Sequence, residues 1–381
     1  MFQALREFRI GRPQVFAGLM LLAFLAQCLW VANTRKITEL EYQYIFAGLP
    51  GPPGAGAKTD ATSPFTSLMA TLPQKAINLA RRFVPVSWSR ALAVPHAWFL
   101  RLPFVIFGVW LGGALWWVAR RLFDDEGGYT ALALYCTSPA MIEVSSNIGT
   151  EIILAWSILG LIYTAIGVAH TLYAPPRKWA PRIVILGLSI GFALATAWWS
   201  FTLVLLAFAY MIYLAPGCRK KVLLVLGSAS VLGCVVLAAI AWMTGGPGLS
   251  VHTLFSQKPT LDVLRDLVFP LSVQTDGYVL VFLFIAALTA YGSWPRARYF
   301  GNTAPLISAW ACVLLFSLAP AIRIWDAALG LTFVFIFIGG LAADLLETRY
   351  RSEAVMILIA AFGVRAVLTV LALRGWVQNL M

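Results

Sequence analysis

The chain has 381 residues, of which 60% are hydrophobic and only 12% are charged, and its mean hydropathy is +0.82. Soluble domains carry roughly twice that share of charged residues, so this composition excludes a soluble globular protein and predicts a polytopic membrane protein. The net charge of +12 does not indicate a nucleic-acid partner. Much of the Lys and Arg lies in short segments between apolar runs, where basic residues set topology and contact anionic lipid.

Apolar runs of about 20 residues recur along the chain and favour membrane-spanning helices over a barrel. The predicted spans are residues 14–33, 103–119, 128–147, 151–172, 183–198, 199–215, 222–243, 277–294, 304–322, 327–346 and 353–373. The first run is too long for a cleaved signal peptide and is interpreted as an uncleaved span. The predicted fold class is therefore all-α: a single transmembrane helix bundle over residues 1–381, with about eleven spans and no separate soluble domain.

Basic residues are concentrated in alternate connecting segments. These segments are residues 1–13, 120–121, 177–182, 219–221, 296–298 and 349–351. Because Lys and Arg are enriched in cytoplasmic loops, we expect the N-terminus in the cytoplasm and the C-terminus on the outer face. The loops at residues 34–102 and 244–276 are then the two long outer loops.

The first outer loop contains a predicted amphipathic helix. After the Gly- and Pro-rich stretch 51–56, apolar residues recur at helical spacing over residues 65–83, and Lys75 and Asn78 lie on the opposite face. Pro73 is expected to kink or divide this segment. A basic amphipathic helix between spans favours a position in the membrane interface. The alternative is a helix that packs under the loop without contact to lipid.

Acidic side chains at the outer membrane boundary are the strongest pointer to function. Glu39 and Glu41 follow the first span, and Glu151 lies between the third and fourth spans. A carboxylate at this depth is costly unless it is used or well partnered. Two other interpretations stay open: Glu39 pairs with Arg35 or Lys36, or Glu151 is a helix N-terminal residue that the helix dipole favours.

A series of short motifs carries a family resemblance. They are Arg101-Leu102-Pro103 with Gly108, then Ala119–Phe123, Gly127–Leu134, Ser138-Pro139, Glu151 and the double span 186–214. Their order and spacing resemble those of membrane glycosyltransferases of the C-type fold, the group of the protein O-mannosyltransferases and the lipid A aminoarabinose transferases. The resemblance covers residues 14–215 well and the remainder loosely.

The resemblance implies an inverting enzyme, in a bacterial inner membrane, with its site on the periplasmic face. Relatives of this type pass a sugar from a polyprenyl-phosphate donor to a lipid, glycan or protein acceptor. The family's acidic motif in the first outer loop falls on Glu41, with Glu39 as the alternate, and its second acid falls on Glu151. Such carboxylates would serve as the base or bind the acceptor. This chain departs from the family by having Glu-Leu-Glu in place of Asp-Glu.

The same resemblance implies cationic and aromatic groups for the donor. Arg323 matches the family's basic residue near the lipid phosphate, and Trp325 beside it is a candidate sugar contact. Arg101 and His96 are lesser candidates for substrate binding. A Mg²⁺ or Mn²⁺ ion could bridge Glu41, Glu151 and the donor phosphate, because hard oxygen ligands suit these ions.

Each of these residues also has a structural interpretation. Arg323 could pair with Asp326, and His96 could be an ordinary loop histidine. Arg365, deep in the last predicted span, is either a functional residue or one that satisfies backbone carbonyls in the bundle. Two other functions remain open for the whole chain: a non-catalytic subunit of a membrane assembly with a partner protein, and a transporter or flippase of lipid-linked sugars.

Overall fold

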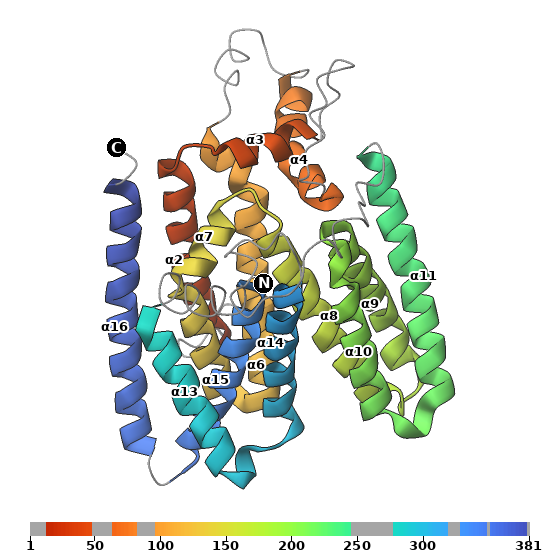
Figure 1. The fold of residues 1–381 in the computed structure, drawn as a ribbon, viewed down its shortest axis with the longest axis vertical. Coiled ribbons are helices and arrows are strands. Elements are labelled where there is room, and N and C mark those ends of the chain that lie inside the picture. The colour runs from red at the N-terminus through yellow and green to blue at the C-terminus, as the bar shows by residue number, and fades with distance from the viewer. Residues whose placement is uncertain are drawn as a thin grey trace, which may run out of the picture.

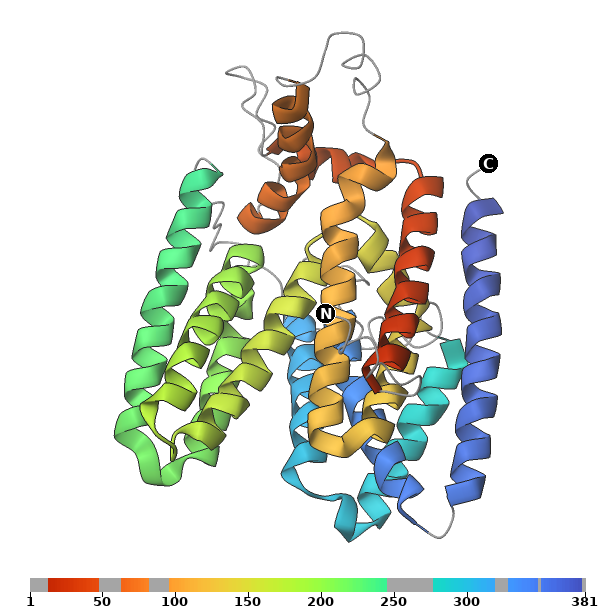
Figure 2. The ribbon, with the colours of Figure 1, turned by 180° about the vertical axis from the view of Figure 1, so that it is seen from behind.

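The computed structural model of the chain describes residues 13–47, 63–81, 96–244, 277–318, 328–348 and 351–378. Within these ranges the regular structure is entirely helical (Figures 1 and 2). Each of the eleven predicted spans overlaps at least one apolar helix, so the predicted all-helical bundle is confirmed.

Two helices, α3 and α4, cap one end of a bundle that the other helices form (Figure 1). In chain order the helices are α2 (Pro13–Thr34), α3 (Glu39–Ala47), α4 (Pro64–Arg81), α6 (Ala97–Cys136), α7 (Pro139–Ser146), α8 (Glu151–Thr171), α9 (Pro176–Thr196), η1 (Trp198–Ser200), α10 (Phe201–Leu214), η2 (Pro216–Cys218), α11 (Arg219–Met243), α13 (Gly277–Ser293), η5 (Pro295–Ala297), α14 (Phe300–Leu318), α15 (Ala328–Leu346) and α16 (Arg351–Gln378).

Seven helices among the described residues are long and apolar enough to cross a membrane, and three shorter apolar helices accompany them. The longest, α6, contains the second predicted span and the first part of the third, because the chain reverses at Phe123 and Asp124. Asp124 has a φ of 59°, a conformation that non-glycine residues seldom adopt. The first arm of α6 (residues 97–122) and its second arm (residues 125–136) therefore lie antiparallel (Figure 2).

The third predicted span is broken. The second arm of α6 ends at Cys136, and α7 begins at Pro139. Proline has no backbone N–H and favours the first position of a helix, and the Ser138 hydroxyl accepts a hydrogen bond from the amide of Met141 at 3.2 Å. The sequence thus ends one helix and begins another inside what hydropathy predicts as a single span.

The helices are arranged around α8 and α15, the two most buried of the spans. Helices α9, α10 and α11 form a wing on one side, and α16 lies on the opposite edge (Figure 1). Helices α3 and α4 cover one end of the bundle, above the connection between α7 and α8. The connections from α10 to α11 and from α13 to α14 lie at the other end, which is where two of the basic segments occur.

The predicted amphipathic helix in the first outer loop is present as α4. It runs through Pro73 as one helix, so the proline does not divide it. Its side chains pack against α6, α9 and α11, and it also contacts α3. Phe65, Ala70 and Ile77 are buried against the bundle, while Lys75, Asn78 and the apolar Leu79 are exposed. Its position relative to lipid stays a prediction.

Glycine allows the first arm of α6 to approach α7 closely. A Cβ atom on Gly108 would lie 2.4 Å from the Ser145 hydroxyl oxygen, and the Gly108 carbonyl accepts a hydrogen bond from the Tyr135 hydroxyl at 2.7 Å. The site described below depends on the placement of α7, which this contact helps to fix.

We expect Gly108→Ala to destabilise the protein by about 1–3 kcal/mol, the usual effect of overpacking. Gly113→Ala on the same helix is the matched control, because its Cβ would meet nothing closer than 3.8 Å. Denaturant or thermal unfolding in detergent measures the difference. Adding Ser145→Gly to Gly108→Ala should restore part of the lost stability. Equal losses of stability in Gly108→Ala and Gly113→Ala would contradict the close contact.

Candidate functional site

Glu41 begins the site as part of a helix cap. It is the third residue of α3, and Thr38 precedes that helix. The Thr38 amide donates to Glu41 Oε2 at 2.8 Å, and the Glu41 amide donates to the Thr38 hydroxyl at 3.3 Å. This reciprocal pair is a capping box, which satisfies backbone donors at a helix start. The Thr-x-x-Glu spacing that encodes it was visible in the sequence and was missed there.

Arg101 completes a buried ion pair with Glu41. Its Nε donates to Glu41 Oε1 at 2.8 Å, and its Nη2 donates to Oε2 at 2.7 Å. The residues are 0% and 2% exposed. Two parallel bonds from a guanidinium to a carboxylate form the strongest and most directional type of ion pair.

The other donors of Arg101 bind the end of α2 and the turn that follows it. Nη1 donates to the carbonyls of Ala32 and Arg35, each at 2.8 Å, and Nη2 donates to that of Lys36 at 2.9 Å. A guanidinium has five N–H donors, so every donor of Arg101 is used within the protein. In this arrangement Arg101 offers none to a substrate phosphate.

Glu41 also binds the connection between α7 and α8 (residues 147–150). The Ile148 amide donates to Glu41 Oε1 at 3.0 Å, and the Thr38 hydroxyl donates to Oε2 at 3.2 Å. Glu41 therefore accepts five hydrogen bonds, where a carboxylate has about four lone-pair sites. Burial alone would raise its pKa. The hydrogen bonds and charge of Arg101, with the amides of Ile148 and Thr38, outweigh burial and hold the pKa of Glu41 below its ordinary value.

A second ion pair lies beside the first. Arg35 Nη1 donates to Glu143 Oε1 at 2.8 Å, and Glu143 is 5% exposed on α7. The sequence analysis did not single out Glu143, although a carboxylate inside a predicted span was the available signal. Arg35 thus has an acidic partner other than the predicted Glu39.

Glu151 lies at the start of α8, three residues after Ile148, and is 8% exposed. A Cβ atom on Gly149 would lie 2.1 Å from a Glu151 carboxylate oxygen, so glycine is needed for this carboxylate to fold back on the connection. Glu41 and Glu151 therefore meet at the same short connection. This position also agrees with an acid placed at a helix N-terminus.

The remaining predicted site residues divide into two groups. Glu39 is exposed at the first position of α3, and His96 is exposed at the residue before α6. Arg323 and Trp325 lie outside the described residues. The structure therefore brings together Glu41, Arg101 and the connection that carries Glu151, while the predicted phosphate-binding arginine is not placed.

The residues expected to hold a divalent ion do not fit that role as a set. Each oxygen of Glu41 already accepts at least two hydrogen bonds within the protein. In the described part of the chain, no cluster of three or more His, Cys, Asp or Glu side chains could surround an ion. We therefore derive no step through a metal at Glu41.

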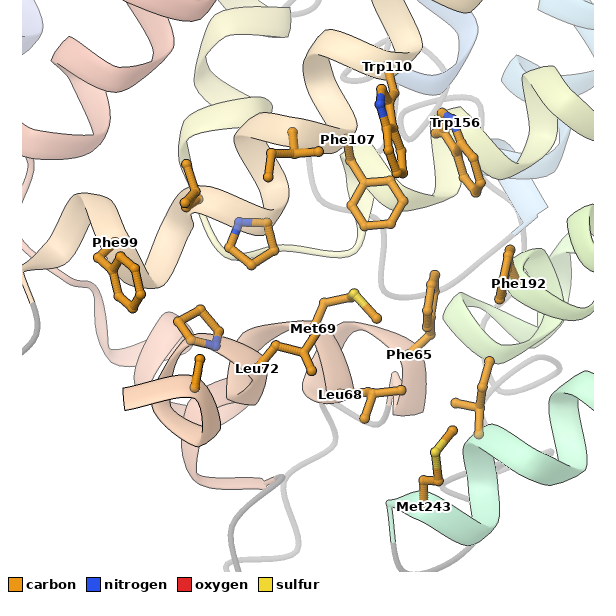
Figure 3. A pocket seen from close by; sticks show the side chains of 16 residues that line it. Phe65, Leu68, Met69, Leu72, Phe99, Phe107, Trp110, Trp156, Phe192 and Met243 are labelled. Carbon is orange, nitrogen blue, oxygen red and sulfur yellow. The ribbon is translucent and has the colours of Figure 1, made fainter. Parts of the chain in front are cut away.

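An apolar groove of about 650 Å³ lies beside the charged site. It is bounded by α4 on one side and by α6, α8, α9 and α11 on the others (Figure 3). The side chains of Phe65, Leu68, Met69 and Leu72 point into it from α4, and Phe107, Trp110 and Trp156 face them across the groove. Trp110 is 56% exposed, so the aromatic wall reaches the outer surface of the bundle.

Aromatic side chains make the inner wall of the groove stiff. Phe65 stacks on Phe192 with ring centroids 4.7 Å apart, and Phe107 packs edge-on to Trp156 at 5.2 Å. Such pairs each contribute about 0.5–1.5 kcal/mol beyond area burial. The groove is thus a formed apolar surface at the junction of the wing and the main bundle.

Two comparisons place this architecture among known proteins. A family model described as dolichyl-phosphate-mannose-protein mannosyltransferase matches residues 87–242, a region that contains Arg101 and Glu151 but not Glu41. Among solved structures, the fold is similar to that of ArnT from Cupriavidus metallidurans in the apo state, with a TM-score of 0.57 and 13% identity. That match covers 96% of this chain and 74% of ArnT. No curated protein matches the sequence.

Together, the bundle, its apolar helices and both comparisons show a multi-pass membrane protein whose fold is that of the C-type glycosyltransferases. The resemblance stated from the sequence motifs is confirmed at this level. The likeness to ArnT concerns the fold, and the sugar donor and acceptor of this chain belong to the proposal below.

We expect Glu41→Gln to destabilise the protein by about 3–5 kcal/mol, because it leaves the charge of Arg101 buried without a counter-ion. Glu39→Gln, at an exposed position on the same helix, is the matched control and should change stability by about 0.5 kcal/mol or less. Unfolding in detergent at neutral pH measures both.

The pH dependence gives a second readout of the same pair. A lowered pKa means that the Glu41 contribution is fully present above the ordinary glutamate pKa of about 4.3 and is lost as the pH falls through the lowered value. Below about pH 4, wild type should therefore lose the stability that the ionised Glu41 contributes, a loss that cannot occur in Glu41→Gln. Parallel pH profiles of the two proteins would contradict this.

Proposed function

We propose that the protein transfers a sugar from a polyprenyl-phosphate donor to an acceptor at the outer face of the membrane. The C-type fold and the family match support glycosyl transfer. The apolar groove beside an acidic, capped end of the bundle supports a lipid-linked donor, because it offers the lipid and the reacting group adjoining sites.

One observation carries this proposal: α8 has Glu151 at its start and Trp156 in the groove wall. Five residues of helix separate them by about 7.5 Å along the axis. A hydrocarbon chain in the groove would therefore bring its phosphate and sugar close to the end of α8, where the carboxylate lies.

Glu151 is the proposed proton acceptor, and Glu39 is the alternate. The acceptor hydroxyl or amine attacks the anomeric carbon, the bond from that carbon to the phosphate oxygen breaks, and the lipid phosphate leaves with the bonding electrons. The attacking group passes its proton to the carboxylate. Attack from the face opposite the leaving phosphate inverts the anomeric centre.

Glu41 and Arg101 have a positioning role in this scheme. The lone pairs of the Glu41 carboxylate and the five N–H donors of Arg101 are all used in hydrogen bonds within the protein. The pair fixes α3 and the connection 147–150 relative to each other, which sets the distance between Glu39 and Glu151. Misplacement by about 1 Å can cost a hundredfold in rate.

The leaving phosphate needs positive charge or oriented donors near it. Arg323 remains the proposed group for this purpose, with Trp325 beside the sugar and His96 as a further polar contact at the same end.

A non-catalytic subunit is the second candidate function. The complete internal bonding of Glu41 favours it, because the best-matched acid of the family motif is engaged in structure here. Such a chain would keep the fold for packing against a partner membrane protein and would show no transfer by itself.

Glycosyl transfer from a pool of radiolabelled polyprenyl-phosphate sugars in proteoliposomes tests the proposal. We expect Glu151→Gln to reduce kcat by about a hundredfold or more, the usual contribution of a general base, with donor binding retained. Glu353→Gln is the control, since Glu353 is exposed on α16, and it should behave as wild type.

The outcomes separate the candidate functions. If Glu39→Gln loses glycosyl transfer and Glu151→Gln keeps the normal rate, Glu39 and not Glu151 is the base. No transfer by wild type, together with a co-purifying membrane partner, would favour the non-catalytic subunit and overturn the proposal. Movement of intact lipid-linked sugar across the bilayer without transfer would indicate a flippase.

The groove can be tested with donors of different chain length. Met69→Trp fills the groove, whereas Leu79→Trp places the same bulk at an exposed position of α4 outside it. If Met69→Trp displaces about two methylene groups of the donor chain from the groove, KM for a long-chain donor should rise about tenfold. KM for a short-chain donor should stay unchanged, and an equal rise for both donors would contradict a lipid site here.

A further inference from the structure

Arg365 is a buried cation on the least buried span. It is 2% exposed, although its helix neighbours Val364 and Val367 are 52% and 60% exposed. An arginine within a span is expensive unless its donors are satisfied. Two of its N–H groups, on Nε and Nη2, donate to one place in the bundle, the break in the third span.

The break deprives several backbone carbonyls of their usual helical donors, among them those of Leu134 and Thr137. The Ser138 amide bonds to the Tyr135 carbonyl at 3.2 Å rather than to that of Leu134. The Met141 amide bonds to the Ser138 hydroxyl rather than to the Thr137 carbonyl. Helix ends always leave such groups, and in a bilayer interior each unsatisfied one costs several kcal/mol.

Helix α16 supplies the missing donors. Arg365 Nη2 donates to the Leu134 carbonyl at 3.2 Å, and its Nε donates to the Thr137 hydroxyl at 3.1 Å. One turn further along, the Thr369 hydroxyl lies 2.6 Å from the Thr137 carbonyl and 2.9 Å from the Arg365 carbonyl of its own helix, and its single proton is directed to the nearer acceptor, Thr137. The cation also lies 5.7 Å from the Phe335 ring centroid, and it complements the negative end of the second arm of α6.

The break leads directly to the acidic site through α7. This helix has eight residues, about 12 Å of length, and all of them are buried. Its Glu143 pairs with Arg35, and its Ser146 hydroxyl, which donates to the Ile142 carbonyl at 2.6 Å, lies 3.1 Å from the Cys28 carbonyl of α2. Two residues beyond its end, the Ile148 amide binds Glu41. A shift at the break would move these contacts together, because a short buried helix moves as a unit.

We propose that Arg365 and Thr369 form an intramembrane clamp that fixes the broken third span, and that they are positioning residues for the site at Glu41 and Glu151. The clamp is remote from the reacting groups, so its effect on rate passes through α7. The part of the inference that concerns catalysis rests on the proposed function. The part that concerns the placement of α7 does not.

Thr369→Val is the main test, because it keeps the shape of the side chain and removes only the donor. Thr369→Ser retains the hydroxyl and is the rescue variant, and Val367→Ala on the exposed face of α16 is the matched control. Hydrogen–deuterium exchange in nanodiscs measures the amides of residues 139–150. We expect Thr369→Val alone to speed their exchange about tenfold or more, and unchanged exchange would overturn the clamp.

Transfer kinetics test the positioning role. Thr369→Val should lower kcat about tenfold, within the range expected for a small misplacement, and leave KM for the donor unchanged. A double-mutant cycle with Glu143→Gln distinguishes positioning from general loss of stability. If the clamp acts through α7, the two effects on kcat are not additive, whereas additive effects would overturn the positioning role.

The two proposals fail separately. A wild type without transfer would contradict the proposed function alone, and the exchange measurement would still decide whether the clamp fixes α7. Normal transfer by wild type with unchanged exchange and kcat in Thr369→Val would overturn the clamp alone.

Discussion

The pairing of Glu41 with Arg101 is the interaction on which the capped end of the bundle depends. It joins three segments that are far apart in sequence: the end of α2 with α3, the first arm of α6, and the connection from α7 to α8. Removing two charges from water is costly unless their remaining hydrogen-bonding groups are also satisfied. Here all are satisfied, so the pair acts as a fixed junction, and the carboxylates at this end are placed relative to it.

The same stretch of α6 separates polar from apolar chemistry. Arg101 turns inward to the junction, while Leu102 and Pro103 face the groove beneath α4. Adjacent residues on a helix point about 100° apart, so one short segment can serve both sides. The capped end of the bundle thus has an acidic site and a hydrocarbon-lined groove that share a wall. That pairing suits a substrate with a charged head and a long apolar chain.

The apolar helices and the helix α4 were predicted from the sequence, because hydropathy is a local signal. Glu41, Arg101 and Glu151 were singled out there because costly charges are local signals too, and their roles stay a prediction. The role of Arg101 was not, because it depends on five acceptors, three of which are backbone carbonyls that no side-chain pattern reveals. Glu143 was missed because it lies within a strongly apolar run. For Arg365, carbonyl binding was one of two interpretations, and the broken span that supplies the carbonyls explains it.

The dependence of α16 on this break also bears on how the protein is assembled in the membrane. A helix with an arginine at its centre is disfavoured in lipid by about 2.5–3.5 kcal/mol on insertion scales. The Leu134 carbonyl is open to Arg365 because the helix breaks after Cys136 and the Ser138 amide bonds to Tyr135 instead. The energetic cost of placing α16 in the membrane therefore depends on the shape of a span that lies 231 residues earlier in the chain.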